Sequence, residues 1–203
     1  WLLCASYCRP HAPLAVPARY LRQYAGKVSQ QWLEPEDEGA ALPYPSHQRQ
    51  NYHLTEITPE QNLQAREAYY GAVEMLDECI GRLLWELQRL GALDNTIIIY
   101  LSDHGDMIGN HGLWWKANYY EEAIRVPWVI SGPGVGAGVA RTELAALVDL
   151  FPTLCALAGV EAPAGLEGVD LSPLLSRAYA GTPPRDHVIS EYYGIGMLTQ
   201  PYN

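Results

Sequence analysis

Apolar side chains between residues 59 and 90 recur every three or four positions, with charged side chains largely between them. This period predicts one amphipathic helix over 59–90. Thr58 and Gln61 have the spacing of a capping box at its start, and Pro59 suits the first helical position. Gly91 is a typical terminating residue. The pattern therefore predicts a long helix with defined ends.

Shorter, continuous apolar runs predict strands. The run 96–101 is rich in β-branched residues, and 126–130 is a second run of this kind. Continuous rather than alternating hydrophobicity indicates burial on both faces, which favours interior strands of a parallel sheet. The runs 1–8 and 188–190 predict two further strands.

A short helix over 149–158 is also predicted, with Asp149 as its cap and Gly159 as its end. Helices that alternate with buried strands predict an α/β fold with a mainly parallel central sheet flanked by helices. In such folds ligands bind at the carboxyl ends of strands. The stretch 24–57 has an acidic run and several prolines, which predict a long surface excursion, either the rim of a substrate site or a plain connection.

Composition narrows the classes of function. The 203 residues carry 13 Lys and Arg against 23 Asp and Glu, a formal net charge of −10. This charge repels phosphate backbones, and no apolar run reaches the length of a membrane-spanning helix. We therefore expect no nucleic-acid partner and no membrane span. The four cysteines form no CxxC pair, so they leave the redox compartment open.

Asp103 and His104 directly follow the run 96–101 and Ser102. A carboxylate and an imidazole at the end of a strand are well suited to hold a divalent cation. Gly105 lets the backbone turn sharply beside them. The alternative interpretation is that Asp103 caps a following turn and that His104 is a half-buried histidine with its hydrogen bonds satisfied.

Lys116 is a second candidate. It and Lys27 are the two lysines of the chain, and Trp115 precedes it. A partly buried ammonium needs an anionic partner, because an unpaired buried charge is costly. Either an internal carboxylate such as Glu121 or Glu122 supplies this partner, or a bound oxyanion does.

His11 is a third candidate. It lies between Pro10 and Pro13, just after the run 1–8, and the prolines stiffen its loop. Imidazoles titrate near neutral pH, which suits proton donation to a leaving group. The alternative interpretation is an ordinary histidine of a surface loop.

Several of these segments occur together in the order and at the spacings of a known family. They are IIIYLSDHGDMIGNHGLWWK at 97–116, YEEAIRVP at 120–127, PHAP at 10–13 with Pro17 and Tyr20, LVDLFPTL at 147–154 and GLEGVDL at 165–171. In this arrangement, collinear over about residues 1–193, the chain resembles the sulfatase family of the alkaline-phosphatase superfamily.

The resemblance implies an alkaline-phosphatase-like fold and a role for each candidate residue. Asp103 and His104 would ligate one divalent metal, usually calcium in sulfatases, with Mn²⁺ or Mg²⁺ as alternatives. Lys116 would neutralise a sulfate oxygen, and His11 would contact the sulfate or assist the leaving group. His111 would be a contact at the rim of the site.

The sequence also departs from the family pattern. The family's nucleophile is a formylglycine made from Cys or Ser in a C/S-x-P-x-R motif of its N-terminal half. Cys8 and Pro10 match that motif, but Ala12 stands where Arg belongs, so we interpret the match as a coincidence. The family's first metal-binding aspartates are absent as well. We expect 1–203 to be part of one sulfatase catalytic domain, without its nucleophile and its C-terminal end, and inactive by itself.

The function that the resemblance implies is hydrolysis of a sulfuric ester, with a small-molecule or sugar sulfate as substrate. A phosphonate monoester or phosphodiester hydrolase of the same superfamily is one alternative. A degenerate, non-catalytic sulfatase-like domain that binds an anion is another. The acidic net charge argues mildly against long polysulfated glycans.

Overall fold

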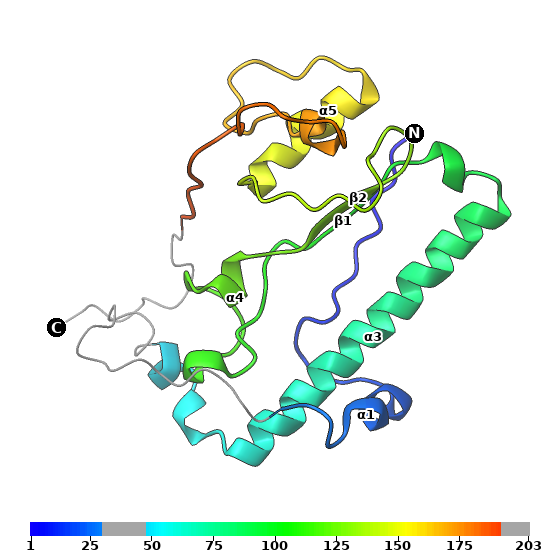
Figure 1. Ribbon diagram of the computed structural model, residues 1–203. Coiled ribbons are helices and arrows are strands. Elements are labelled where there is room, and N and C mark those ends of the chain that lie inside the picture. Colours follow the sequence, from blue (N-terminus) through cyan, green and yellow to red (C-terminus); the bar gives the residue numbers. More distant parts are fainter. Residues whose placement is uncertain (30–47, 192–203) are drawn as a thin grey trace. The chain divides into compact units, whose positions relative to one another are not determined.

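The computed structural model of the chain, shown in Figure 1, describes residues 1–29 and 48–191. These residues form two compact units, each described here by itself. Within the described residues, the first unit consists of 1–89 and 104–126, and the second of 90–103 and 127–191.

The first unit is helical. Its elements in chain order are α1 (Ala18–Tyr24), a helical turn at 48–51, the 3₁₀ turn η1 (Leu54–Glu56), α3 (Pro59–Arg89), the 3₁₀ turn η3 (Asn110–Gly112) and α4 (Glu121–Ile124).

The helix predicted over 59–90 is confirmed as α3. Its predicted capping box is present, because Thr58 Oγ1 accepts the N–H of Gln61 at 3.2 Å and Gln61 Oε1 accepts the N–H of Thr58 at 2.9 Å. Gly91 follows the helix with a left-handed φ of 66°, a conformation that glycine adopts without steric cost.

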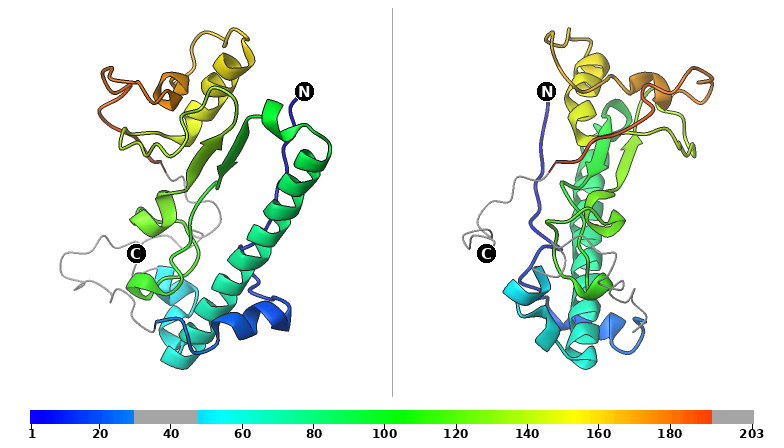
Figure 2. Two further views of the ribbon diagram at one scale, coloured as in Figure 1. Left: turned by 45° about the vertical axis from the view of Figure 1, so that its right-hand side comes forward. Right: turned by 90° about the vertical axis from the view of Figure 1, so that its left-hand side faces the viewer.

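Burial along α3 differs from the predicted stripe. The buried residues lie in its first half and are Asn62, Arg66, Glu67, Ala68, Gly71 and Ala72. In the second half, Val73 and Leu90 are 41% and 67% exposed. The reason is that α1 packs against α3 near its middle (Figure 2) and the loop after His104 packs against its start.

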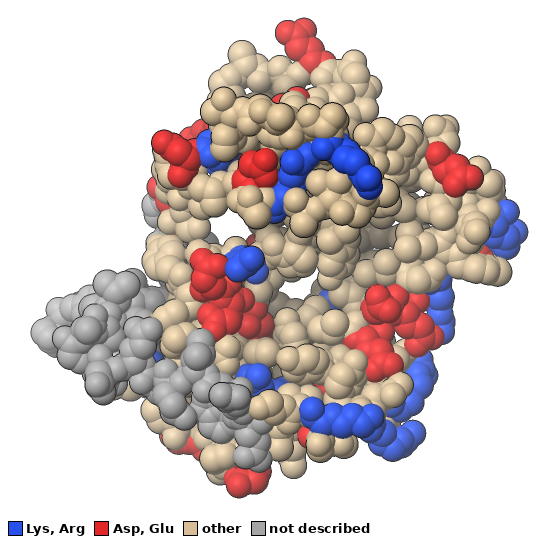
Figure 3. All heavy atoms as spheres, in the orientation of Figure 1, with Lys and Arg blue, Asp and Glu red and all other residues tan. Residues whose placement is uncertain are grey.

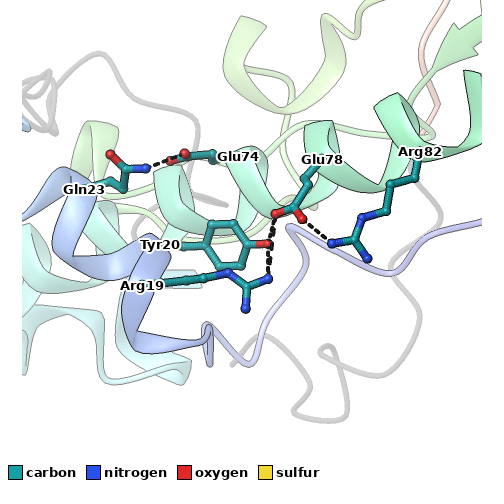
Figure 4. Close-up of polar contacts among 6 residues, drawn as sticks. All are labelled: Arg19, Tyr20, Gln23, Glu74, Glu78 and Arg82. Carbon is teal, nitrogen blue, oxygen red and sulfur yellow. Dashed lines mark hydrogen bonds and ion pairs between the residues drawn. The ribbon is translucent and has the colours of Figure 1, made fainter. Parts of the chain in front are cut away.

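The junction between α1 and α3 is polar (Figure 4). Tyr20 of α1 is 5% exposed, and its hydroxyl donates to the carboxylate of Glu78 on α3. Arg82 donates to the same carboxylate, and Gln23 donates to Glu74 at 2.9 Å. The hydrogen bonds from Tyr20 and Arg82 hold the pKa of the Glu78 carboxyl below its ordinary value of 4.5.

This unit also contains an apolar core. Its buried members are Leu54, Met107, Leu113, Trp114 and Ala123. Most of them belong to the loop that follows His104, so this loop is packed as core rather than left on the surface. A loop packed in this way can hold a side chain in a fixed position.

The second unit combines helices with a small sheet. Its elements are the 3₁₀ turn η2 (Leu93–Asn95), β1 (Ile98–Leu101), β2 (Trp128–Ser131), the 3₁₀ turn η4 (Leu147–Asp149), α5 (Leu150–Ala158) and the 3₁₀ turn η5 (Ser172–Leu175). Helices together with a sheet confirm the predicted α/β class.

The strand direction corrects one expectation. β1 and β2 were predicted as interior strands of a parallel sheet, but they pair antiparallel, with Ile98 opposite Ser131 and Leu101 opposite Trp128. A continuous apolar run indicates burial of both faces of a strand. It does not fix the direction of the neighbouring strand, and this is why the prediction failed for this pair.

Two predicted strands are absent from the described residues. The segments 1–8 and 188–190 have no regular secondary structure, and Trp1 and Ile189 are 86% and 74% exposed. A strand needs a neighbouring backbone for its hydrogen bonds. Within residues 1–29 and 48–191 neither segment pairs with another strand.

Asp149 does not cap α5 as predicted. Its carboxylate is fully buried and accepts the N–H groups of Ala146 and Val169, each at 2.8 Å. It also pairs with Arg185. One carboxylate thus joins three segments of the second unit, through partners that the local sequence did not indicate. The predicted end of α5 is confirmed, since Gly159 follows it with a φ of 68°.

The predicted surface excursion 24–57 is described only in part, because 30–47 lie outside the described residues. In the part that is described, Gln48 is 1% exposed. Arg49 and Leu54 are buried as well, whereas 50–51, 53 and 55–57 are exposed, so the described part of the segment lies at the surface and is anchored by a few buried side chains. In the part of the chain that the structure describes, no helix combines the length and the apolar character needed to cross a membrane.

Gly71 and Gly81 of α3 offer a matched test of the α1 packing. A Cβ added at Gly71 would lie 3.3 Å from the backbone carbonyl carbon of Tyr20, whereas nothing lies within 4 Å of one added at Gly81. We expect Gly81→Ala to raise the free energy of unfolding by about 1 kcal/mol. Gly71→Ala should lower it, because the backbone of α1 has to move. Urea titrations compare the two variants, and equal stabilisation by both would contradict the close packing.

The carboxyl of Glu78 makes stability depend on pH. Because its folded-state pKa lies below 4.5, its contribution is fully present above the unfolded-state pKa and is lost as the pH falls through the folded-state pKa. We expect Tyr20→Phe to lower the free energy of unfolding at neutral pH and to reduce its loss in acid. Tyr70→Phe is the control and alters a tyrosine of α3 that is 40% exposed. It should change neither the free energy of unfolding at neutral pH nor its loss in acid. An unchanged acid loss in Tyr20→Phe, measured by denaturation at a series of pH values, would refute this role of the hydroxyl.

Candidate functional site

His11 and Lys116 are in direct contact. The Nζ atom of Lys116 lies 2.7 Å from Nε2 of His11, and Nδ1 of His11 lies 2.8 Å from the carbonyl oxygen of Ala12. A carbonyl oxygen only accepts hydrogen bonds, so Nδ1 carries the ring proton and Nε2 presents a lone pair. The ammonium of Lys116 therefore donates to a neutral imidazole.

His104 lies beside this pair. The ring centroids of His11 and His104 are 5.9 Å apart, with an edge-to-face angle of 66°. Nδ1 of His104 lies 2.8 Å from the carbonyl oxygen of Gly105, so by the same argument its lone pair is on Nε2. A backbone carbonyl that fixes the tautomer in this way is typical of histidines that ligate metals through the other nitrogen.

Asp103 is an exposed residue that follows β1 and immediately precedes His104. Because the two residues are consecutive, a carboxylate and an imidazole nitrogen lie on one short stretch of chain. Within residues 1–29 and 48–191, no group of three or more His, Cys, Asp or Glu side chains is arranged to hold a metal. The described chain thus offers two candidate ligands and no complete site.

Gly105 is required at its position by a close approach. Its N–H donates to the carbonyl of Ala123 at 2.8 Å, and a Cβ would collide with the carbonyl of Glu122. Gly105 lies in no turn or bend, so the sharp turn predicted for it is not observed, and the glycine is required instead by the backbone packed directly against it.

Asp106 folds the loop that carries Lys116. Its Oδ1 accepts the N–H of Ile108 at 2.9 Å and the N–H of Trp115 at 3.1 Å. The N–H of Met107 donates to the carbonyl of Trp115 at 2.8 Å. These hydrogen bonds join the two ends of the loop directly before Lys116, as Asp side chains commonly do in turns.

The backbone around Lys116 is unusual. Trp115 and Ala117, its two neighbours, have φ values of 66° and 70°. Residues other than glycine adopt this left-handed region at a cost of about 1–3 kcal/mol, and they remain there only when the surroundings hold them. Gln48 is one such restraint, since its Nε2 donates to the carbonyl of Lys116 at 2.8 Å.

The two carboxylates that were candidate partners of Lys116 are engaged elsewhere. Glu121 forms an ion pair with Arg125 at 3.9 Å, and Glu122 accepts a hydrogen bond from Asn110 at 2.9 Å. The ammonium of Lys116 contacts Nε2 of His11 instead. Lys116 is half-buried, so an anion can still approach its ammonium.

His111 does not lie at a rim. It is 7% exposed and stacks on Tyr120, with ring centroids 4.0 Å apart and an angle of 13° between the planes. Its Nε2 lies 3.8 Å from the carboxylate of Glu122. His111 therefore belongs to the interior of the loop, and this corrects the contact that the resemblance implied for it.

Acidic and basic side chains are interspersed over the face of the molecule drawn in Figure 3. The excess of 23 Asp and Glu over 13 Lys and Arg applies to the chain as a whole. The positive charge of Lys116 therefore stands in a chain whose net charge is negative.

Sequence reasoning missed the residues that support Lys116. An aspartate before a glycine-rich stretch is a turn signal and could have identified Asp106. Gln48 gave no signal, because its partner lies 68 residues further along the chain. Only folding brings Gln48 and Lys116 together.

A family model and several known proteins that are similar to this chain point to the same family. The family model for Sulfatase matches residues 1–160. A choline-sulfatase of Rhizobium meliloti (strain 1021) is 34% identical over 204 residues, which cover 95% of this chain and 38% of that protein. An N-acetylglucosamine-6-O-sulfatase of Bacteroides thetaiotaomicron is 41% identical over 126 residues, which cover 62% of this chain and 22% of that protein.

Solved structures agree with the sequence comparisons. A phosphonate monoester hydrolase from Silicibacter pomeroyi superimposes with a TM-score of 0.76 and 28% identity, over 83% of this chain and 36% of that one. The fold is therefore that of the alkaline-phosphatase superfamily.

The chain spans 38% or less of the length of these curated relatives. Sulfatases generally use a metal ion and a formylglycine residue. The sulfatase model matches most of the chain, the relatives align along its length, and the fold is shared. This chain therefore belongs to the sulfatase family.

Proposed function

We propose that the protein hydrolyses sulfuric esters and that this chain supplies part of the binding site for the sulfate group. The observation that carries the proposal is the contact between Lys116 and the neutral imidazole of His11, 2.7 Å apart and beside His104. In a chain of the sulfatase family, these residues form a charged group and a proton-transfer group next to each other.

Lys116 is proposed to neutralise an oxygen of the sulfate group. Its ammonium carries three N–H donors, one of which is directed at His11. The other donors remain for an oxyanion. A fixed positive charge in a partly shielded site stabilises charge that develops on such oxygens during hydrolysis.

His11 is proposed to assist the departing alcohol. Its Nδ1 proton is held by the carbonyl of Ala12, so Nε2 is the atom that exchanges a proton with its surroundings. Nε2 can take up a proton from water and pass it to the leaving oxygen, while Lys116 keeps its positive charge.

Asp103 and His104 are proposed as two ligands of a divalent cation, with Ca²⁺ as the first candidate and Mn²⁺ or Mg²⁺ as alternatives. The donor set fits in chemical terms, since a carboxylate oxygen and the Nε2 lone pair of His104 can both bind a cation. When bound, a cation there would supply positive charge for the sulfate oxygens.

The proposed substrate is a small-molecule or sugar sulfate ester, in line with the choline-sulfatase and N-acetylglucosamine-6-O-sulfatase among the relatives. Hydrolysis of a phosphonate monoester is the second candidate function, because a phosphonate monoester hydrolase shares the fold with a TM-score of 0.76. Rates of the intact protein on an aryl sulfate and on an aryl phosphonate separate the two, and a faster phosphonate reaction would favour the second.

Replacing Lys116 tests its proposed role. We expect Lys116→Ala in the intact protein to lower kcat for an aryl sulfate by about 100- to 1,000-fold, as loss of a group that stabilises developing charge does elsewhere. Lys27→Ala, which removes the exposed other lysine, is the matched control and should keep the wild-type rate. A wild-type rate for Lys116→Ala, measured by release of the phenol, would exclude Lys116 from the site.

Metal binding is tested apart from catalysis. We expect Asp103→Asn to weaken the binding of Ca²⁺ by at least about tenfold, because the amide supplies no negative charge to the cation. Asp94→Asn changes another exposed aspartate and should leave the affinity unchanged. Calorimetric titration and elemental analysis of the purified proteins provide the readout. Equal affinities for Asp103→Asn and wild type would remove Asp103 from the ligand set.

A further inference from the structure

The segment 48–52 lies against the stretch of loop that ends at Lys116. Gln48 is 1% exposed, and its Nε2 donates to the carbonyl of Lys116 at 2.8 Å. Arg49 is 8% exposed, and its Nη1 donates to the carbonyl of His111 at 3.2 Å. Those two carbonyls are five residues apart, so the segment holds the stretch 111–116 at both ends.

Tyr52 adds an aromatic contact between the same two segments. Its ring centroid lies 5.0 Å from that of Trp115, with an edge-to-face angle of 70°. Trp115 directly precedes Lys116 and has a left-handed φ of 66°. A bulky residue stays in that conformation only where packing restrains it, and Tyr52 supplies part of this packing.

We propose that Gln48 is a positioning residue for Lys116 and that Arg49 and Tyr52 complete the same clamp. Gln48 contacts the main chain of Lys116 and acts through it. The inference rests on the proposed function, because it assigns to Gln48 the task of holding an ammonium that acts on sulfate.

The clamp is useful because a lysine side chain is long and flexible. Lys116 has two anchors in this structure, the imidazole of His11 at its ammonium and the amide of Gln48 at its carbonyl. Fixing the main chain limits the directions from which the ammonium can reach the sulfate. A charge that is already in position stabilises the transition state without the cost of reorganisation.

A second observation supports a positioning role over plain packing. The Oε1 atom of Gln48 is buried and has no hydrogen-bond partner among the described residues. A buried acceptor without a partner destabilises the fold, and an apolar side chain of similar volume would fill the same space without that cost. The presence of an amide at position 48 is therefore explained by its N–H donor, which binds the carbonyl of Lys116.

The test is Gln48→Met in the intact protein, which keeps the side-chain volume and removes the donor. We expect kcat for an aryl sulfate to fall by about 10- to 100-fold, with KM little changed, because a catalytic group displaced by about 1 Å loses activity on this scale. Gln50→Met is the matched control, since Gln50 is an exposed glutamine of the same helical turn. It should behave as wild type.

A double-mutant cycle with Lys116→Ala separates positioning from general stability. If Gln48 acts through Lys116, Gln48→Met causes little further loss once the ammonium is gone. An undiminished loss in the Lys116→Ala background would overturn the positioning role. A wild-type kcat for Gln48→Met would also overturn the positioning role. If kcat of Lys116→Ala is lowered in the same experiment, the proposed function still stands. A wild-type rate for Lys116→Ala would overturn both.

A readout without turnover covers the case in which Lys116→Ala has no measurable rate. We expect the ¹⁵N resonance of Nε2 of His11, assigned with His11→Gln, to shift in Gln48→Met and not in Gln50→Met. That nitrogen accepts the hydrogen bond of Lys116, so a displaced ammonium changes its environment. Identical spectra for Gln48→Met and wild type would refute the clamp.

Discussion

The hydrogen bond from the Lys116 ammonium to Nε2 of His11 is the contact on which the site depends, because it joins segments 105 residues apart. It requires a neutral imidazole with its proton on Nδ1, and the carbonyl of Ala12 enforces that tautomer. His104 packs beside the pair with its own tautomer fixed by Gly105. Two backbone carbonyls thus determine which nitrogen of each imidazole carries the lone pair.

The first unit, which contains this contact, also buries polar side chains. Beside the apolar core around Met107 and Leu113, it buries Gln48, Asn62 and His111, each with one side-chain atom that lacks a partner among the described residues. A fully apolar interior would be more favourable in energy, but it would not hold a loop through its carbonyls. Of these polar groups, Gln48 holds the loop directly, through the carbonyl of Lys116.

The same fold occurs in enzymes that are named for different substrates. A phosphonate monoester hydrolase shares this architecture, and a choline-sulfatase and an N-acetylglucosamine-6-O-sulfatase are 34% and 41% identical to the chain over the matched residues. A fold supports several related reactions, and the groups that contact the reacting atoms select among them. The roles proposed for Lys116 and His11 would serve a sulfate and a phosphonate alike, so groups other than these two would select between them.

The sequence by itself determined what depends on neighbours along the chain: the helix from Pro59 with its capping box, the α/β class and the family. Its candidates His11, His104 and Lys116 also lie together. Strand direction, the buried role of Asp149 and the support from Gln48 were decided by tertiary structure alone. Each of these depends on a hydrogen-bond partner distant in sequence, and such a partner leaves no trace in local periodicity or spacing.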